Sequence, residues 1–198
     1  MNTITMIRIL ALLLIAGAFT ISGYFRSKAD RSDEKIDFSA EETWQRRLRV
    51  GGALAFYLGM LAWLIYPPLM AWGDLAWPMG MRWFGLTLAA TNLPLLYWMF
   101  SNLGNSITPT VKTRKQHRLV TSGPYQYIRH PLYTFGTLFF VGIILITGNW
   151  FIMVGAVVSL TALFARTPQE EAMLLERFGE EYREYMGRTG RYLPRLGG

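Results

Sequence analysis

The chain alternates between long apolar runs and shorter polar segments. In the first half, apolar residues extend over Ile9–Phe25, Val50–Gly73 and Trp83 to about Phe100. Runs of this length approach the roughly 20 residues that a helix needs to cross the hydrocarbon core of a bilayer. The Pro67-Pro68 pair must end or kink the second helix, and Pro94 is expected to kink the third. The pattern predicts three membrane helices in this half of the chain.

The longest uncharged run follows in the second half. Residues 131–165 hold no charged side chain over 35 positions. A single helix of that length would extend roughly 50 Å, well beyond the roughly 30 Å of the hydrocarbon core. Gly148-Asn149, near the middle, is typical of a turn. We therefore expect a tight helical hairpin with arms at 132–147 and 150–165.

The polar segments between these runs predict the orientation of the chain. Residues 26–49 hold seven Lys or Arg and six acids, and residues 101–131 hold five Lys or Arg and no acid. Because basic loops face the cytoplasm, both segments are expected there. Ser39 with Glu42 forms a capping-box pattern that predicts an interfacial helix before the second span. The chain is thus expected to be an all-α polytopic membrane protein with about five spans, its N-terminus outside and its C-terminus inside.

Residues 1–25 have an alternative interpretation as a cleaved signal peptide. Ala16-Gly17-Ala18 loosely resembles a cleavage site. Cleavage would leave the basic segment 26–49 outside, against the positive-inside rule. We therefore expect a retained helix in an inner (cytoplasmic) membrane.

Composition supports a membrane protein and excludes several other classes. Hydrophobic residues make up 52% of the chain and charged residues 17%, and the mean hydropathy is +0.21, which is too apolar for an ordinary soluble domain. The net charge is +7, but the basic residues lie in blocks between the apolar runs, as in the loops of a membrane protein. No nucleic-acid partner is therefore expected. The absence of cysteine excludes disulfides, thiolate metal sites and a cysteine nucleophile. No glycine-rich nucleotide-binding motif is present.

Residues 166–198 are charged again and are expected to contain an amphipathic helix. Pro168 suits its first turn, as do Glu170 and Glu171. Five apolar or aromatic residues then follow at helical spacing and predict one continuous stripe: Leu174, Leu175, Phe178, Tyr182 and Tyr185.

The hairpin brings its own two ends together. His130 and Tyr133 at its entry should therefore lie near Arg166, Glu170 and Glu171 at its exit. Ionisable groups at the mouth of a membrane bundle are functional candidates. Each also has a structural interpretation, such as a helix cap, a membrane anchor or a favourable charge in a first helical turn. The two histidines of the chain, without cysteine, make a weak metal site, so no metal is expected.

Four segments resemble the isoprenylcysteine carboxyl methyltransferase family of integral membrane enzymes, within the wider phospholipid methyltransferase-like group. They are His117-Arg-Leu-Val-Thr-Ser-Gly-Pro-Tyr125, Arg129-His-Pro-Leu-Tyr133, Arg166-Thr-Pro-Gln-Glu-Glu171 and Phe178-Gly-Glu-Glu-Tyr182. The resemblance covers roughly residues 100–195, so a catalytic region at 100–198 is expected to follow the N-terminal helices and connector at 1–99.

The resemblance implies S-adenosylmethionine as methyl donor, S-adenosylhomocysteine as product, and a cytoplasmic cofactor pocket. Glu170 would meet the amino group of the donor, and Arg166 would face the acceptor with Glu171 orienting it. The implied cofactor-binding residues are His117, Leu119, Val120, Gly123, Tyr125, Arg129, His130, Tyr133 and Glu170, and the implied catalytic residues are Arg166 and Glu171.

The expected activity is methylation of a lipophilic or amphiphilic acceptor, either a small molecule or a lipid-modified group. Carboxyl O-methylation is favoured because Arg166 can hold a carboxylate through two hydrogen bonds. Phospholipid N-methylation, with Glu171 as partner or base, remains an alternative, as do a membrane NADPH-dependent reductase and a non-enzymatic scaffold. Membrane lipids are expected partners. The oligomeric state stays open, because the Gly51, Ala55 and Gly59 spacing permits packing within one chain or between two.

Overall fold

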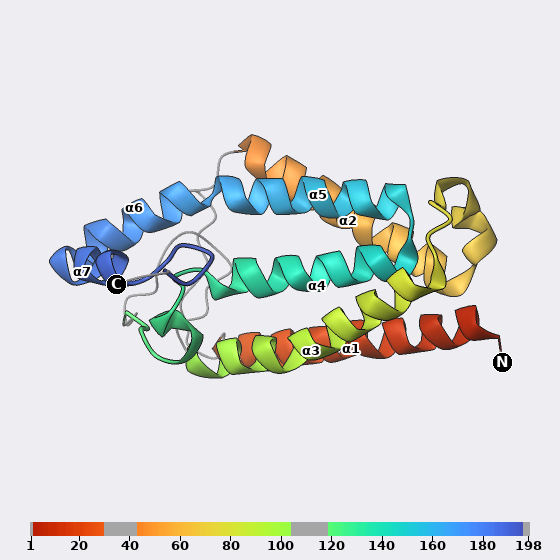
Figure 1. Cartoon of the computed structure of the whole chain (residues 1–198). Helices are drawn as coiled ribbons and strands as arrows, with labels where there is room; N and C mark the ends of the chain where they lie inside the picture. Colours follow the sequence, from red (N-terminus) through yellow and green to blue (C-terminus); the bar gives the residue numbers. More distant parts are fainter. Residues whose placement is uncertain (1, 30–42, 104–118, 196–198) are drawn as a thin grey trace.

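The protein is a bundle of long helices with two short helices at one end (Figure 1). A computed structural model describes residues 2–29, 43–103 and 119–195. The N-terminal half contains α1 (Thr3–Ala29), α2 (Thr43–Ile65), the 3₁₀ helix η1 (Pro67–Gly73) and α3 (Met79–Leu103). The second half contains the 3₁₀ helix η3 (Gly123–Gln126), α4 (Pro131–Thr147), α5 (Trp150–Ala165), α6 (Thr167–Phe178) and α7 (Glu180–Arg188).

The predicted helical hairpin is confirmed, and its turn explains why it forms. Gly148 ends α4 with φ 55°, in the left-handed region that glycine adopts at low cost. Its N–H donates to the carbonyl of Ile144 at 2.9 Å. Asn149 then caps α5, because its side-chain oxygen accepts hydrogen bonds from the N–H groups of Phe151 and Ile152 at 3.1 and 3.3 Å. Two residues therefore reverse the chain.

The two arms of the hairpin pack mainly on other helices. Helix α5 lies along α2, and α4 lies along α3, which also contacts α1. Glycines allow these close approaches. A Cβ added at Gly155 of α5 would lie 2.7 Å from the backbone nitrogen of Phe56, and one at Gly85 of α3 would lie 2.6 Å from the carbonyl oxygen of Gly142. Gly59 also faces α5, whereas Gly51 has nothing within 4 Å, so the glycine spacing noted in the sequence does not form one packing face.

Three helical segments among the described residues are long and apolar enough to cross a membrane. They are Thr3–Lys28, Thr43–Ile65 and Trp150–Phe178, and α4 is a shorter apolar helix. Because α3 is in neither group, the count of five spans stays a prediction. The second helix ends before Pro67-Pro68, as predicted, but it begins at Thr43. The capping-box pattern at Ser39 and Glu42 lies outside the described residues.

The prediction of one continuous helix after the hairpin is wrong. Gly179 has φ 54° and ψ −123° and separates α6 from α7. This combination lies in a region of backbone space that is essentially restricted to glycine. The stripe of Leu174 to Tyr185 is therefore divided between two helices that meet at an angle (Figure 1).

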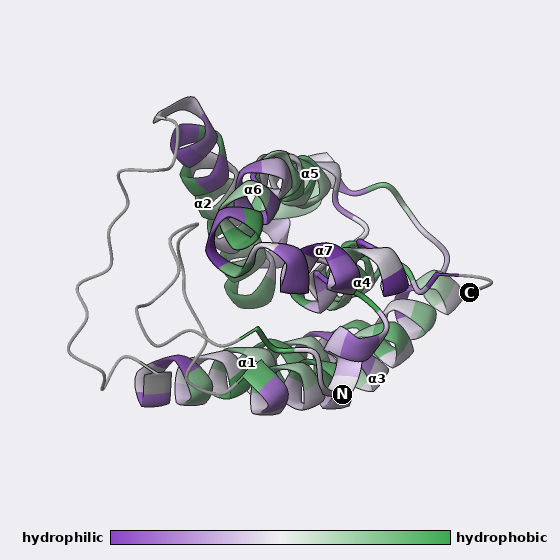
Figure 2. Ribbon diagram, turned by 90° about the vertical axis from the view of Figure 1, so that its left-hand side faces the viewer, coloured by the Kyte–Doolittle hydropathy of each residue, from purple (hydrophilic) through white to green (hydrophobic). Residues whose placement is uncertain are grey.

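One end of the bundle is polar. Figure 2 looks at that end, where much of α7 and the near end of α2 are hydrophilic. Helices α6 and α7 and the chain before α4 lie there, while the N-terminus, η1 and the hairpin turn lie at the opposite end (Figure 1). The sequence-predicted site residues that the structure describes all belong to the polar end.

Candidate active site at the polar end of the bundle

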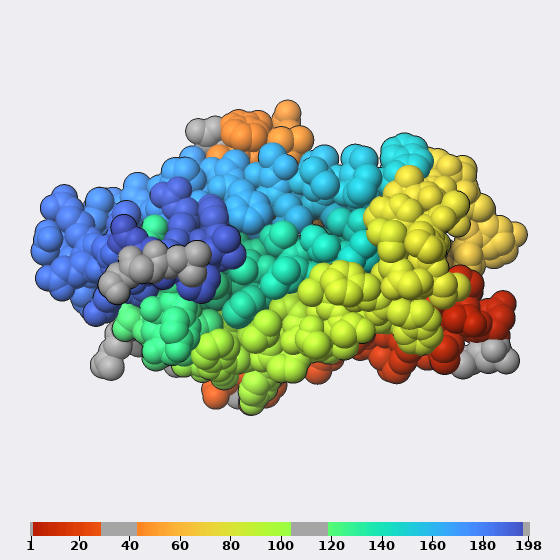
Figure 3. Space-filling model, viewed as in Figure 1, coloured from red at the N-terminus to blue at the C-terminus, as the bar shows by residue number. Residues whose placement is uncertain are grey.

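The segment before α4 and the segment after α7 meet at the polar end through backbone hydrogen bonds. The N–H groups of Arg129 and His130 donate to the carbonyls of Gly190 and Arg191 at 2.8 and 3.0 Å. The N–H of Gly190 donates to the carbonyl of Tyr127 at 3.1 Å, completing a short parallel bridge. Figure 3 shows the C-terminal segment, in deep blue, against the green loop that precedes α4. The segment after α7 is therefore held against the segment that leads into α4.

Glu171 of α6 is the point where these segments converge. Its Oε1 accepts a hydrogen bond from Arg129 Nε at 3.0 Å and lies 3.2 Å from His130 Nε2. Its Oε2 accepts a hydrogen bond from Arg191 Nη2. The carboxylate is buried. Its arginine partners come from two separate segments, and this favours the ionised form of Glu171.

Glu170 forms a second, neighbouring cluster. Tyr133 donates its hydroxyl to Glu170 Oε2 at 2.6 Å, and Arg166 Nη2 lies 3.2 Å from Oε1. His130 Nδ1 is 3.8 Å from Glu170 Oε2, so the imidazole lies between the two glutamates. The predicted proximity of His130, Tyr133, Arg166, Glu170 and Glu171 is thus confirmed.

The predicted pairing of Arg166 with Glu171 is wrong. Arg166 pairs with Glu170, four positions later in the chain. Residues four apart lie on the same face of a helix, whereas the next residue turns away from that face. Glu171 consequently points toward Arg129 and Arg191.

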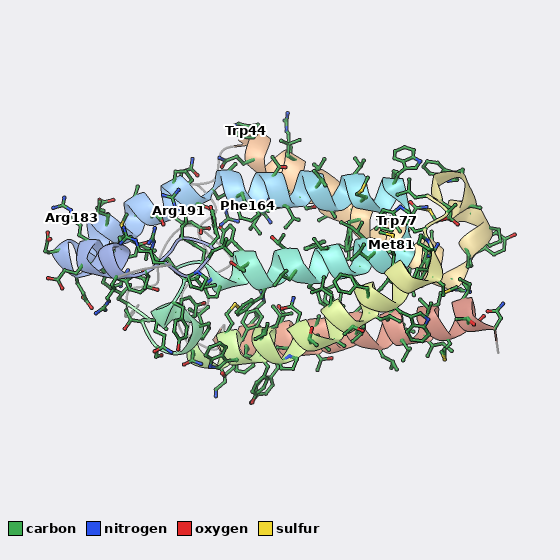
Figure 4. All side chains as sticks on the ribbon, in the orientation of Figure 1. Trp44, Trp77, Met81, Phe164, Arg183 and Arg191 are labelled. Atoms are coloured by element: carbon green, nitrogen blue, oxygen red, sulfur yellow. The ribbon has the colours of Figure 1, made fainter. Side chains whose placement is uncertain are left out.

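Tyr192 holds the C-terminal segment against the hairpin. Its hydroxyl donates to Thr167 Oγ1 at 2.7 Å, and its carbonyl accepts a hydrogen bond from the Thr134 hydroxyl at 2.6 Å. Its ring packs edge-on against Phe164, with ring centroids 4.9 Å apart. Figure 4 labels Phe164 and Arg191 close to the end of α5, while Arg183 lies at the far tip of the polar end. These contacts hold Arg191 beside Glu171.

A cavity of about 90 Å³ lies beside the charged clusters. The loop before α4 supplies one wall, and α6 and α7 supply the other. Arg129 borders the cavity and also binds Glu171, so it joins the two parts of the site. The described residues that line it are Leu103, Leu119, Val120, Tyr125, Arg129, Leu174, Phe178, Tyr182 and Tyr185.

Two tyrosines of α7 are buried in the wall of this cavity. The Tyr185 hydroxyl donates to the carbonyl of Tyr125 at 2.6 Å, and burial raises the pKa of Tyr185 to about 12. Burial, and then the nearby charge of Glu171, also raise the pKa of Tyr182. The Tyr182 hydroxyl is buried and has no hydrogen-bond partner among the described residues. It is a donor that a ligand in the cavity can satisfy.

The predicted cofactor residues separate into two groups. Leu119, Val120, Tyr125 and Arg129 line the cavity. His130, Tyr133 and Glu170 belong to the charged clusters instead. Gly123 lines neither, and a side chain there would collide with Asn102. His117 lies outside the described residues.

Three further residues contact the charged clusters and the hairpin but were not predicted from the sequence: Arg191, Tyr192 and Thr167. Arg191 and Tyr192 follow the last helix without a periodic pattern, and backbone pairing with the loop before α4 brings them to the site. Thr167 lay inside a quoted motif, but its hydroxyl partner Tyr192 was not predicted. No group of three or more His, Asp or Glu side chains in the described part of the chain could hold a metal ion.

Comparison with known proteins identifies the family. The family model described as phospholipid methyltransferase matches residues 81–181, just over half of the chain. The chain belongs to the phospholipid methyltransferase family. The match begins near the start of α3 and ends in α7, so it includes every cavity-lining residue named above except Tyr182 and Tyr185.

Curated relatives of this family member include isoprenylcysteine methyltransferases. Protein-S-isoprenylcysteine O-methyltransferase B of Arabidopsis thaliana is 34% identical over 114 residues, covering 56% of this chain and 58% of the relative. The protein-S-isoprenylcysteine O-methyltransferase of Homo sapiens is 35% identical over 98 residues, covering 48% of this chain and 34% of the relative. The alignments thus include less than two thirds of either relative. The resemblance predicted from the motifs is confirmed.

A solved structure extends the likeness to most of the chain. The eukaryotic intramembrane Ras methyltransferase, an isoprenylcysteine carboxyl methyltransferase, superposes with a TM-score of 0.54 at 19% identity, covering 93% of this chain and 67% of that one. At this identity the likeness concerns the fold. A shared fold with an intramembrane protein, together with the apolar helices, makes this chain an integral membrane protein.

Proposed function

We propose that this chain is a membrane methyltransferase that methylates a carboxylate on a lipid-modified acceptor, with S-adenosylmethionine as donor. The observation that carries the proposal is the position of Arg129. It borders the aromatic cavity and binds Glu171, beside the cluster of Glu170, Arg166 and Tyr133. A methyl donor that reached from the cavity to Glu170 would present its methyl group near Arg166.

The residues present fit the two ends of such a donor. The cavity of about 90 Å³ is smaller than the roughly 300–1,000 Å³ of pockets that enclose a whole ligand. It therefore suits one end of the donor, the purine, among Leu119, Val120 and Tyr125, with the Tyr182 hydroxyl as a hydrogen-bond donor. The carboxylate of Glu170 suits the ammonium at the other end. His117 belongs to the same proposed pocket by its motif.

Methyl transfer from this donor makes modest demands on the protein. S-adenosylmethionine supplies a methyl group that its sulfonium already activates, so alignment of the reactants provides most of the catalysis. Arg166, which is buried, would hold the acceptor carboxylate. A carboxylate needs no deprotonation near neutral pH, so no general base is required. Glu171 would then position Arg129 and His130.

An apolar groove suits the lipid part of the acceptor. A space of about 160 Å³ lies between α1, α2, α3 and α4. Its lining includes Phe19, Phe56, Phe100, Leu132 and Phe140. Leu132 precedes Tyr133 in the chain, so an apolar chain in this groove would bring its polar end toward the charged clusters. The names of the relatives favour an isoprenylcysteine as the acceptor.

We place the site on the cytoplasmic face of an inner membrane. The support is the excess of basic residues in 101–131, which immediately precedes the hairpin. A cytoplasmic site would also face the cellular supply of a soluble donor.

Titration calorimetry with S-adenosylhomocysteine tests the donor site. The detergent-purified protein should bind it saturably, and His130→Ala and Glu170→Ala should lose binding. Arg183→Ala is the matched control, because Arg183 is exposed on α7 away from the site. If the folded, monodisperse wild type does not bind S-adenosylhomocysteine, the proposal is wrong.

Product analysis tests the acceptor. N-acetyl-S-farnesylcysteine should gain one methyl group, detected by mass spectrometry, whereas phosphatidylethanolamine should not. Arg166→Ala should lose this turnover while it still binds S-adenosylhomocysteine. If phosphatidylethanolamine is methylated and N-acetyl-S-farnesylcysteine is not, the proposal of carboxyl methylation is wrong and phospholipid N-methylation is supported. Membership of a methyltransferase family does not favour the reductase alternative.

A further inference from the structure

A second polar cavity lies at the opposite end of the bundle from the candidate active site. Its volume is about 280 Å³. It is bordered by α1, the end of α2, η1, the start of α3 and the hairpin turn. Figure 4 labels Trp77 and Met81 at this end. The 17 residues of α4 separate the two sites by roughly 25 Å, so this cavity has no part in the proposed methyl transfer.

Arg82, one of two arginines that line this cavity, is bound by the protein through both of its terminal nitrogens. Its Nη1 donates to the carbonyls of Ile146 and Thr147, each at 2.8 Å. These are carbonyls of the last turn of α4, which lack helical partners. Its Nη2 pairs with Asp74 Oδ1 at 3.3 Å. Arg82 therefore supplies hydrogen bonds to two free carbonyls at the end of α4, and its charge is balanced by Asp74.

Arg8 is different, because no carboxylate among the described residues pairs with it. It is the sole charged residue of positions 1–25 and lies in an apolar helix. Its Nη2 donates to the carbonyl of Leu64, but its Nε is buried without a hydrogen-bond partner in the described part of the chain. A guanidinium has five N–H donors. A cation within a membrane helix is costly and usually faces a cavity or a partner.

The charges that line the cavity leave one positive charge in excess. Arg8, Arg82 and Asp74 are its ionisable residues, and Asp74 is the partner of Arg82. Asn149 and Thr147 add polar side chains, although the Asn149 amide already donates to Met70. A ligand that satisfies this site must supply negative charge and hydrogen-bond acceptors toward Arg8.

The remaining lining is apolar and continues onto the exterior of the bundle. Trp63, Pro67, Pro68 and Ile4 border the cavity. The nearby faces of α1 and α2 carry exposed apolar side chains, which include Leu12, Leu13, Leu61 and Ile65. Exposed tryptophans surround this end, as they do at a membrane interface: Trp72, Trp83 and Trp150.

We propose that this cavity binds an oxyanion, the phosphate of an anionic phospholipid, with Arg8 as its principal ligand. The phosphate would pair with the Arg8 guanidinium through charge-assisted hydrogen bonds. The acyl chains would run along the exposed apolar faces of α1 and α2. The site is a lipid-binding site in the leaflet opposite the candidate active site.

Calorimetry with three probes distinguishes the ligand class. The full-length protein in a nonionic detergent is titrated with dihexanoyl phosphatidic acid, dihexanoylglycerol and inorganic phosphate. Phosphatidic acid should bind at least about tenfold more tightly than dihexanoylglycerol, because the latter lacks the charge-assisted bonds. Equally tight binding of inorganic phosphate would support the oxyanion site and identify free phosphate as its source. Equal affinities for phosphatidic acid and dihexanoylglycerol would overturn the proposal.

Two variants test the assigned residue and the cavity. Arg8→Gln should weaken phosphatidic acid binding about tenfold or more, while Arg183→Gln on α7 should leave it unchanged. Ala71→Phe narrows the cavity without a change in charge, at an exposed position that tolerates a larger residue, and should also weaken binding. Retained S-adenosylhomocysteine binding reports an intact fold. If Arg8→Gln does not fold, the proposal is tested by Ala71→Phe alone. An Ala71→Phe variant that binds phosphatidic acid with wild-type affinity would overturn the proposal.

Discussion

Glu171 receives hydrogen bonds from two arginines and contacts His130, so three side chains of the polar end meet at one carboxylate. Its hydrogen bond to Arg191 raises the pKa of that arginine. Arg129 additionally donates to the carbonyls of Met186 and Thr189. One carboxylate thus connects α6 to the loop before α4 and to the segment after α7. Both walls of the cavity depend on it.

Glu171→Gln should destabilise the protein by about 3–5 kcal/mol, because it leaves Arg129, whose side chain is only 9% exposed, without a balancing charge. Thermal unfolding in detergent measures the change. The matched control is Glu176→Gln, an exposed position on the same helix, which should stay within about 0.5 kcal/mol of wild type. Equal unfolding temperatures for the two variants would contradict the assigned role of Glu171.

Tyr133→Phe should weaken S-adenosylhomocysteine binding by about tenfold, because it removes the hydroxyl that orients Glu170. Calorimetry measures the affinity. Tyr127→Phe is the control, since Tyr127 is 53% exposed and its hydroxyl is outside the cluster. A Tyr133→Phe variant with wild-type affinity would mean that Glu170 needs no support from this hydroxyl.

The sequence predicted which residues form this cluster, but it did not predict which glutamate pairs with which arginine. The short hairpin turn brings its own ends together, so His130 and Tyr133 could be placed near Glu170 and Glu171 in advance. Which glutamate meets Arg166 depends on the rotation of α6, and the pairing with Glu171 was wrong. Arg191 was missed because backbone pairing, which leaves no sequence pattern, brings it to the site.

At the scale of elements, the sequence predicted the turn of the hairpin, but it predicted neither the interruption of the last helix nor which helices pack together. Gly148-Asn149 lies between two apolar runs, and the length of the uncharged segment requires a reversal there. Gly179 interrupts a stripe whose spacing fits one continuous helix, and isolated glycines are tolerated in helices. The pairing of α5 with α2 depends on glycines that face each other across helices distant in the chain.

Gly155→Ala should destabilise the bundle by about 1–3 kcal/mol. Its Cβ would lie 2.7 Å from the backbone nitrogen of Phe56, so α2 and α5 would have to separate. Gly136→Ala on α4 has nothing within 4 Å of its Cβ and should be neutral or stabilise by about 0.5–1 kcal/mol. Unfolding in a mixed-detergent titration measures both. Equal changes in the free energy of unfolding for the two variants would contradict the close packing of α2 on α5.

At the scale of the whole molecule, the apolar runs predicted a polytopic helical protein, and the family and fold comparisons confirm that class. The two ends of the bundle carry different charged residues. The end with the candidate active site carries the acidic and basic side chains of α6 and α7, whereas the other end carries Arg8, Asp74 and Arg82. The cavity at the end opposite the candidate active site could not be predicted, because it is enclosed by segments that are far apart in the chain and have no common motif. The resemblance did imply a cofactor pocket, and four of the residues implied for it, Leu119, Val120, Tyr125 and Arg129, line the cavity at the polar end.

Single-cysteine labelling tests the orientation of these two ends. The chain holds no cysteine, so each variant carries one thiol. One variant is Leu69→Cys on η1, where the wild-type leucine is 59% exposed. The other is Arg183→Cys, which lies on the exposed face of α7. In spheroplasts of a bacterial host, a membrane-impermeant maleimide should label Leu69→Cys directly. It should label Arg183→Cys only after lysis, because the basic segment 101–131 is expected to stay inside. The opposite pattern would place the proposed donor pocket outside the cell, away from a cytoplasmic methyl donor, and would contradict the proposed orientation of the enzyme.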